Sequence, residues 1–326
     1  MRRRTFIALL SGTAVVGSLD AWAQQSQPPL IAVLEGASAA TMADRYDAFR
    51  AGLRELGYVD GVNIRIEYRY ADGFLDRLGA LAAELVRLQP RVIVSAPVPA
   101  NLAASKATST IPIVMATGAD PVRFGLVQSL SRPGGNVTGL TNFAEELASK
   151  QIDIIREMLP HLARIGAIIN VENPLHVPQW KETQEAAAKA SLALVHYDYR
   201  TPDDLERAFA HFAHEKVEAV LVPPDVTFGA YRARIAELAT SARLPTIYFN
   251  RESVVAGGLV SYGPNLVENY RRAAVFVDKI LKGAKPGELP VERPNKIALV
   301  INLNTAKELG LTVRPSLIAR TDEVIE

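Results

Sequence analysis

Cysteine is absent from all 326 residues of the chain. Its absence excludes disulfide bonds, a thiolate nucleophile and any cysteine-based metal site. An exported chain of this sequence is also not expected to be a lipoprotein anchored through an N-terminal cysteine. A racemase of two similar lobes, whose acid and base would both be thiols, is excluded for the same reason.

An excess of charge of one sign is also lacking, because 36 Lys and Arg residues face 35 Asp and Glu residues. Without residues 1–23 the chain keeps 33 basic and 34 acidic residues. A nucleic-acid partner requires a basic face, so none is expected. No apolar run reaches 18 residues, and the sequence therefore predicts no membrane-spanning helix.

The N-terminus has the pattern of an export signal. Arg2, Arg3 and Arg4 precede a short apolar stretch over residues 6–16, and Ala21 and Ala23 flank a tryptophan. This pattern predicts a signal peptide over residues 1–23 that is cleaved near Ala23. The arginine pair also fits a twin-arginine signal, so the general secretory route and the twin-arginine route both stay open. Either route predicts a periplasmic protein.

Familiar enzyme motifs are missing. The sequence has no G-x-G-x-x-G after its first strand, no G-x-x-x-x-G-K-[ST] and no G-x-S-x-G. These motifs bind dinucleotides, bind nucleotide phosphates and present a catalytic serine. Among five histidines, only His211 and His214 are spaced to share a helix face, which is too little for a metal site. We therefore expect no cofactor, no metal and no enzymatic activity.

Short apolar runs alternate with longer amphipathic segments along the chain. Residues 30–34 indicate a buried strand, and residues 42–56 carry apolar side chains at helical spacing. The alternation continues with strands at residues 62–70, 91–95 and 111–115, and then at residues 165–169, 192–197, 219–222 and 245–249. Strands separated by helices predict βαβ units and parallel sheets. Because the second series repeats the plan of the first, we expect an α/β protein of two Rossmann-like lobes.

The last part of the chain departs from this alternation. Residues 257–263 form an apolar segment bounded by glycines, and residues 265–281 predict a helix. Residues 283–294 carry three prolines and two glycines, which indicates an extended linker before a strand at residues 297–302. A helix that returns after the second lobe suggests that the chain crosses between the lobes more than once.

Small and polar residues follow the predicted strands. Ligands of open parallel sheets bind beyond the carboxyl ends of the strands, near helix N-termini that attract anions. Hydroxyl and N–H groups there suit a carboxylate, whereas Asp225, Asp120 or Glu252 suits an ammonium group. The candidate ligand-binding residues are Gly36, Ser38, Ser95, Thr117, Asn170, Asp225, Asn250 and Glu252.

Each candidate has a competing structural role, because small polar residues after strands also cap the next helix. Asp120 precedes a proline, which is the pattern of a cap, and we interpret it as one. Asp225 has no such proline after it, so a cap and a ligand contact both stay open for this residue.

Three strings of residues carry a family resemblance: residues 120–139, 256–265 and 301–325. On these strings the chain resembles the type I periplasmic substrate-binding proteins of ABC transporters. Within them it is similar to the branch that contains tryptophan- and tyrosine-type binding proteins. The resemblance implies two lobes joined by three crossover hinge segments, near residues 138–143, 256–262 and 289–297. It also implies that seven of the eight candidates contact a ligand. The eighth candidate, Glu252, rests only on its position after a predicted strand.

The resemblance completes the expected organisation. Residues 24–140 with 263–296 are expected to form the N-terminal lobe, and residues 141–262 with 297–326 the C-terminal lobe. The protein is expected to be a monomer that closes on an amino acid or a small carboxylate and delivers it to an inner-membrane permease with its ATPase. Two alternatives stay open: an exported sensing module that signals to a receptor, and an exported α/β enzyme of unknown reaction.

Overall fold

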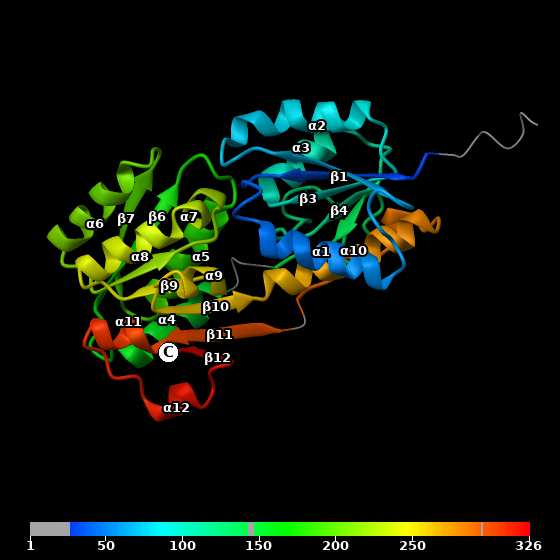
Figure 1. The fold of residues 1–326 in the computed structure, drawn as a ribbon. Helices are drawn as coiled ribbons and strands as arrows, with labels where there is room; N and C mark the ends of the chain where they lie inside the picture. Colours follow the sequence, from blue (N-terminus) through cyan, green and yellow to red (C-terminus); the bar gives the residue numbers. More distant parts are fainter. Residues whose placement is uncertain (1–26, 143–146, 295) are drawn as a thin grey trace, which may run out of the picture.

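The computed structural model describes residues 27–142, 147–294 and 296–326. These residues form two layered α/β units side by side (Figure 1). The predicted signal peptide over residues 1–23 lies outside the described residues. Among the described residues, no helix combines the length and apolarity needed to cross a membrane.

The first unit is built on a five-stranded sheet in which every pairing is parallel. Its strand order is β2 (Arg65–Tyr70), β1 (Leu30–Glu35), β3 (Val92–Ala96), β4 (Ile113–Met115) and β5 (Val137–Gly139). β1 and β3 are buried at every residue. This burial explains why they read as continuous apolar runs, because helices cover both faces of the sheet.

Two helix pairs cover the first sheet. On one face lie α1 (Ala43–Glu55) and α10 (Leu266–Leu281), which run alongside each other (Figure 1). On the other face lie α2 (Leu78–Arg87), preceded by the short η2 (Leu75–Arg77), and α3 (Val98–Ala107). Helix α10 therefore belongs to the first unit, although it follows most of the second unit in the sequence.

The second unit is built on a seven-stranded sheet. Its strand order is β12 (Glu323–Ile325), β11 (Ile297–Asn302), β10 (Val260–Pro264), β9 (Thr246–Tyr248), β8 (Ala219–Val222), β6 (Arg164–Asn170) and β7 (Ala193–Tyr199). The pairing of β10 with β11 is antiparallel, and the other pairings are parallel. The expectation of two Rossmann-like sheets is confirmed, with one antiparallel step near the edge of the second.

Helices also cover both faces of the second sheet. One core contains residues of α4 (Ala148–Met158), α5 (His176–Lys189), α11 (Leu303–Glu308) and α12 (Pro315–Ile318). The other contains residues of α6 (Asp204–His214), α7 (Val226–Ala230), α8 (Arg232–Ser241) and α9 (Arg251–Val255). The remaining short element, η4 (Pro286–Glu288), lies beside β5 of the first sheet.

The chain passes between the two sheets three times, and one passage differs from the expectation. The first follows β5, and the third leads from η4 to β11. The second, expected at residues 256–262, lies later, because β10 pairs within the second sheet up to Pro264. Gly257, with a φ of +108°, ends α9 and turns the chain into β10 instead of carrying it across.

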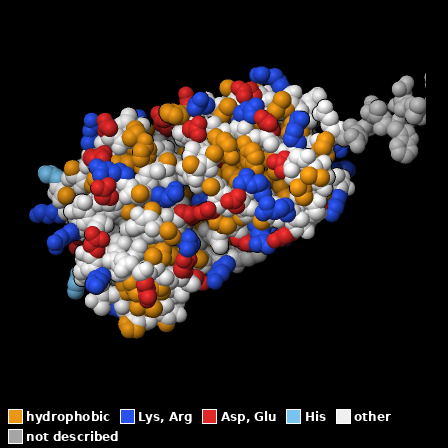
Figure 2. Space-filling view, in the orientation of Figure 1, with side chains coloured by type: hydrophobic (Ala, Val, Ile, Leu, Met, Phe, Trp, Pro, Cys, Tyr) orange, Lys and Arg blue, Asp and Glu red, His pale blue; other side chains and the backbone are white. Residues whose placement is uncertain are grey.

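The described surface carries charges of both signs. Figure 2 shows basic and acidic side chains interspersed over the face it presents, on both units. This mixture agrees with the near-zero net charge of the sequence. That face therefore has no broad basic area of the kind that holds a nucleic-acid backbone.

The close approach of α1 to α10 depends on Gly52. A Cβ atom at this position would lie 2.6 Å from the carbonyl oxygen of Arg271 and 3.0 Å from the Cβ of Ala274. We expect Gly52→Ala to force these helices apart and to lower the free energy of unfolding by about 1–3 kcal/mol. Urea unfolding followed by circular dichroism measures this change.

Gly79 of α2 is the matched control, because a Cβ there would meet nothing within 4 Å. Gly79→Ala is expected to leave stability unchanged or raise it by up to about 1 kcal/mol, since alanine favours a helix more than glycine does. Equal destabilisation by both substitutions would contradict the steric explanation.

Candidate functional site

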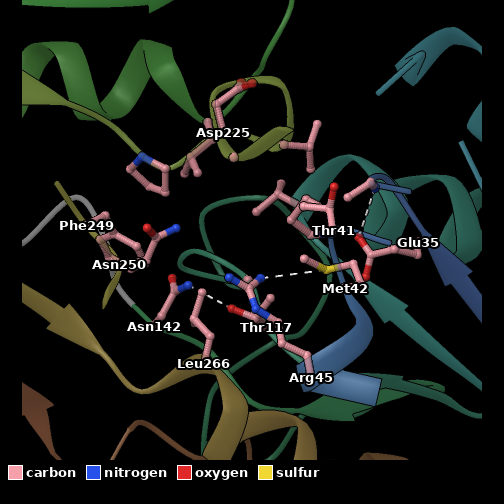
Figure 3. Close-up of a pocket in the computed structure, with 18 of the residues that line it drawn as sticks. Glu35, Thr41, Met42, Arg45, Thr117, Asn142, Asp225, Phe249, Asn250 and Leu266 are labelled. Atoms are coloured by element: carbon pink, nitrogen blue, oxygen red, sulfur yellow. Dashed lines mark hydrogen bonds between the residues drawn. The ribbon is translucent and has the colours of Figure 1, made fainter. Parts of the chain in front are cut away.

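A cavity of about 90 Å³ lies between the carboxyl-end loops of the two sheets (Figure 3). The first unit contributes residues of β1, α1, α3, α10 and the loops after β4 and β5, and the second contributes the loops after β6, β8 and β9. One buried water needs roughly 10–15 Å³ on this measure, so the cavity has room for a small organic molecule. The general location predicted from the strand ends is therefore where the structure has its cavity.

Glu35 forms a buried carboxylate at the end of β1, with only 1% of its surface exposed. Its Oε1 accepts a hydrogen bond from the backbone N–H of Ala37 at 3.1 Å, and its Oε2 accepts from the hydroxyls of Tyr46 and Tyr270, each at 2.8 Å. Burial raises the pKa of Glu35, although these donors oppose the rise. Burial likewise raises the pKa values of Tyr46 and Tyr270, so both phenols stay protonated donors.

An ion pair joins the two units across the cavity. Arg45 of α1 donates from Nε at 3.2 Å and from Nη2 at 3.0 Å to Oε1 of Glu252 in α9. Burial alone would raise the pKa of Glu252, but the charge and hydrogen bonds of Arg45, together with a backbone hydrogen bond, outweigh burial and hold that pKa below its ordinary value. The guanidinium carbon also lies 6.0 Å from the ring centre of Tyr270. The pair exists only while α1 and α9 are close, so moving the two units apart at this point would break it.

Arg45 keeps a third donor group that the ion pair does not use. Its Nη1 lies 3.8 Å from the Sδ of Met42 (Figure 3). A thioether is a weak acceptor, so this end of the guanidinium keeps most of its capacity to bind an oxygen anion.

A chain of hydrogen bonds leads from β3 to the first passage between the units. Ser95 Oγ donates to Asn101 Oδ1 at 2.7 Å, and Asn101 Nδ2 donates to the carbonyl oxygen of Thr117 at 2.9 Å. The Nδ2 of Asn142 then donates to Thr117 Oγ1 at 2.8 Å. Ser95 is buried and satisfied within this chain, whereas Thr117 and Asn142 line the cavity.

Asp225 is the N-cap of α7, and its carboxylate is fully engaged. Oδ1 accepts from the backbone N–H groups of Thr227 at 2.7 Å and Phe228 at 3.4 Å. Oδ2 accepts from Asn173 Nδ2 at 2.7 Å and from Asn170 Nδ2 at 3.0 Å. Asp225 therefore has the capping role that the sequence left open, and it also lines the cavity, so its ligand contact stays a prediction.

His176 completes the cluster around Asp225. The backbone N–H of Asn170 donates to its Nδ1 at 2.8 Å, so the neutral ring carries its proton on Nε2. That nitrogen lies 3.3 Å from the carbonyl oxygen of Pro224 and 3.6 Å from Oδ2 of Asp225. Burial lowers the pKa of His176 and outweighs the opposing charge of Asp225. The cluster is therefore a neutral imidazole and a carboxylate that hold the loops after β6 and β8 together.

The structure separates the eight predicted ligand-binding residues into two groups. The residues that line the cavity are Thr117, Asp225, Asn250 and Glu252. Gly36, Ser38, Ser95 and Asn170 are not among the residues that line the cavity, and ligand contact for all eight residues stays a prediction. Each of these four has a structural role, Ser95 and Asn170 in the networks just described.

Gly36 and Ser38 shape the loop after β1. A Cβ atom on Gly36 would lie 3.0 Å from the Cδ of Pro97 and 3.3 Å from the Cγ1 of Val226, a residue of the other unit. Glycine therefore lets the two units approach at this point. The hydroxyl of Ser38 hydrogen bonds to Thr41 Oγ1 at 2.9 Å and accepts from the backbone N–H of Thr41 at 3.3 Å, which closes the turn before α1.

Several cavity residues escaped the argument from strand ends. Arg45 and Met42 come from the start of α1, Asn142 from the first passage, and Leu266 and Tyr270 from α10. The predicted helix at residues 265–281, which returns to the first unit, was the feature of the sequence that pointed to α10. No comparable signal in the sequence marked Asn142 or Arg45.

Metal binding has no support in the described part of the chain. Within residues 27–142, 147–294 and 296–326, no three His, Asp or Glu side chains come close enough to hold a metal ion. His211 and His214, which share α6, stand on the outer side of the second unit.

Comparisons with known proteins agree on one family. A family model described as ABC transporter substrate binding protein matches residues 30–325. The chain is 27% identical over 263 residues to a tyrosine-binding protein of Clostridioides difficile, covering 81% of this chain and 75% of that protein.

Two solved structures share both fold and sequence similarity with the chain. A conserved domain protein of Vibrio cholerae is 28% identical, with a TM-score of 0.86. A domain from Streptococcus pneumonia, described as an ABC domain in complex with L-Trp, is 27% identical, with a TM-score of 0.85. Each alignment covers 91% of this chain and 100% of the other.

Asp225→Ala tests the structural role of the α7 cap. The substitution removes the N-cap and leaves the amides of Asn170 and Asn173 without their acceptor, so we expect stability to fall by about 2–4 kcal/mol. Asp120→Ala is the control, because Asp120 caps an exposed turn through Val122 and Arg123 and should cost about 1 kcal/mol or less. Urea unfolding of the unliganded protein measures both, and equal losses would refute the role given to the buried cluster.

Proposed function

Because this chain belongs to the ABC transporter substrate-binding protein family, we propose that it closes on an L-amino acid with an apolar or aromatic side chain. Membership of the family makes it the solute-binding component of an importer, outside the cytoplasmic membrane, with an ABC permease as its partner, and not an enzyme. The amino-acid class is the further step. It follows the ligands named for the relatives, tyrosine and L-Trp, and the composition of the cavity.

The apolar part of the cavity suits a hydrophobic side chain. Its wall includes Met42, Leu175, Val226, Phe249, Leu266 and Tyr270, which come from both units. Buried apolar surface contributes about 25 cal/mol per Å², so an aromatic side chain enclosed here would supply much of the binding free energy. Both units must close for this enclosure to be complete.

The polar part of the cavity suits a carboxylate. Nη1 of Arg45 keeps its donor capacity beside Met42, and the amide of Asn250 offers a second donor. Asn250 caps α9 by accepting through Oδ1 from the backbone N–H and the hydroxyl of Ser253, at 3.2 and 2.7 Å. This arrangement fixes the amide so that Nδ2 is the group left for a ligand. A guanidinium and an amide N–H are good partners for a ligand carboxylate.

The single observation that carries this proposal is the cavity enclosed by both units and spanned by the Arg45–Glu252 ion pair. We propose that the first sheet with α1, α2, α3 and α10, and the second sheet with its helices, move as two lobes about the three passages. A ligand favours the closed arrangement only by its differential affinity for that arrangement. Contacts to both lobes supply this difference.

A ligand screen tests the proposed function. The chain from Gln24 onward is mixed with the twenty L-amino acids, small carboxylates and sugars, and its melting temperature is followed. An apolar or aromatic L-amino acid should stabilise the protein by about 2.7 kcal/mol at a hundred times its Kd, because it binds only the native state. Its D-enantiomer is the control and should stabilise far less. Stabilisation by sugars alone, or chemical conversion of the ligand during calorimetry, would refute the proposal.

The expected export remains a proposal, since residues 1–23 lie outside the described residues. The arginines, the apolar stretch and the small residues around Trp22 support a periplasmic protein cleaved near Ala23. The monomeric state stays a prediction. Intact-mass measurement of the protein from a periplasmic extract should show Gln24 as the first residue. Lysine in place of Arg3 and Arg4 should block export only if the twin-arginine route is used. An uncleaved cytoplasmic chain would refute export.

A further inference from the structure

The three carboxylates that line the cavity are all engaged by protein donors. Glu35 accepts three hydrogen bonds, Glu252 pairs with Arg45, and Asp225 accepts four. Of the expected partners of a ligand ammonium group, Asp225 therefore uses both carboxylate oxygens within the protein, and Glu252 has its charge balanced by Arg45 through Oε1. Asp120, the third residue considered, does not line the cavity.

The neutral acceptors of the cavity are also largely used. Oδ1 of Asn250 takes its two bonds from Ser253, and Oδ1 of Asn173 accepts from the backbone N–H of Leu175 at 3.0 Å. The hydroxyl of Thr41 is bonded to Ser38. These side chains therefore have little acceptor capacity left for a ligand.

Asn142 is the exception among the cavity residues. Its side-chain oxygen is buried and has no hydrogen-bond partner among the described residues, although the residue is only 9% exposed. Figure 3 shows the amide beside the cavity with its nitrogen bonded to Thr117. A buried acceptor without a partner is costly and rare in native proteins. An N–H donor on a ligand would remove this cost.

The backbone around Asn142 holds this oxygen in place. The backbone N–H of Asn142 donates to the carbonyl oxygen of Gly118 at 2.7 Å, and that of Thr141 donates to Glu292 at 3.0 Å. The hydroxyl of Thr141 donates to the carbonyl oxygen of Ala119 at 2.6 Å. Asn142 is thus a fixed group at the start of the first passage between the lobes.

We propose that Oδ1 of Asn142 accepts a hydrogen bond from the α-ammonium group of the bound amino acid. This contact makes Asn142 the residue that distinguishes amino acids from carboxylates of the same shape without the amino group. The inference rests on the proposed function. It places the ammonium group at the passage between the lobes and the ligand carboxylate toward Arg45.

The test compares each amino acid with its analogue that lacks the amino group. The pairs are L-tryptophan with indolepropionate, L-phenylalanine with phenylpropionate, and L-leucine with methylpentanoate. The comparison uses the pair whose amino acid binds most tightly. Calorimetry should show that the wild-type chain binds this amino acid about 10- to 100-fold more tightly than its analogue. Asn142→Leu should abolish this preference: the affinity for the amino acid should fall 10- to 100-fold, and the affinity for the analogue should fall less than about threefold. Asn142→Asp should retain it, because a carboxylate oxygen also accepts from an ammonium group.

Asn269→Leu is the matched control. Asn269 is a 5% exposed asparagine with an unpartnered Nδ2, and it lies outside the cavity. This variant should keep the full preference for the amino acid over its analogue. Its melting temperature shows how far the loss of a buried amide lowers the stability of the fold. Equal weakening of amino acid and analogue by Asn142→Leu would make its role structural and overturn the proposal.

Two other outcomes separate this inference from the function on which it rests. If the wild-type chain binds an amino acid and Asn142→Leu keeps the full preference over the analogue, the inference is wrong and the proposed function stands. If the wild-type chain binds none of the apolar or aromatic L-amino acids in the ligand screen, both are wrong.

Discussion

The ion pair between Arg45 and Glu252 joins the two lobes across the cavity, and it can form only where α1 and α9 meet. The two side chains are 13% and 26% exposed, so their attraction is weakly screened, but both groups have also lost much of their hydration. Partly buried pairs of this kind gain little net free energy, because desolvation offsets most of the attraction. The pair is therefore suited to guiding closure without locking it. A ligand that contacts both lobes can then decide the equilibrium.

The strand-end residues show how capping limits what is left for a ligand. The two carboxylate oxygens of Asp225 accept hydrogen bonds from α7 and from two neighbouring side-chain amides, and the side-chain oxygen of Asn250 accepts from α9. Helix starts at the carboxyl ends of parallel strands need such acceptors, whatever the protein binds. Recognition is then left to the atoms that capping does not use. In this cavity they include Nη1 of Arg45, Nδ2 of Asn250 and Oδ1 of Asn142.

The sequence sufficed for the elements of the fold and for the side of each sheet on which the cavity lies. Apolar periodicity reports burial directly, and β1 and β3, buried at every residue, gave unbroken apolar runs. It did not suffice for the second passage, because Gly257 could serve either a crossover or a tight turn into β10. It also did not separate Asn170 from Asn250, since both follow a strand and only packing decides which amide reaches the cavity.

Arg45 and Asn142 illustrate a different limit. A basic residue on an amphipathic helix reads as a solvated side chain, and only the approach of α9 from the other lobe gives Arg45 a partner. Asn142 lies in a connecting segment whose partners, Gly118 and Glu292, are distant in sequence. Interactions that depend on two lobes meeting are absent from local sequence patterns.

The position of α10 links recognition to the motion of the lobes. Leu266 and Tyr270 line the cavity within the first two turns of α10, directly after the chain has left β10 of the second lobe. Asn142 likewise lies directly after β5, where the chain leaves the first lobe. The ligand is thus expected to touch two of the three segments about which the lobes turn. Contacts close to a hinge move little when two lobes turn, so a ligand that touches Asn142 and α10 can keep these contacts in both arrangements. Its contacts to the second lobe then give it the differential affinity that favours closure.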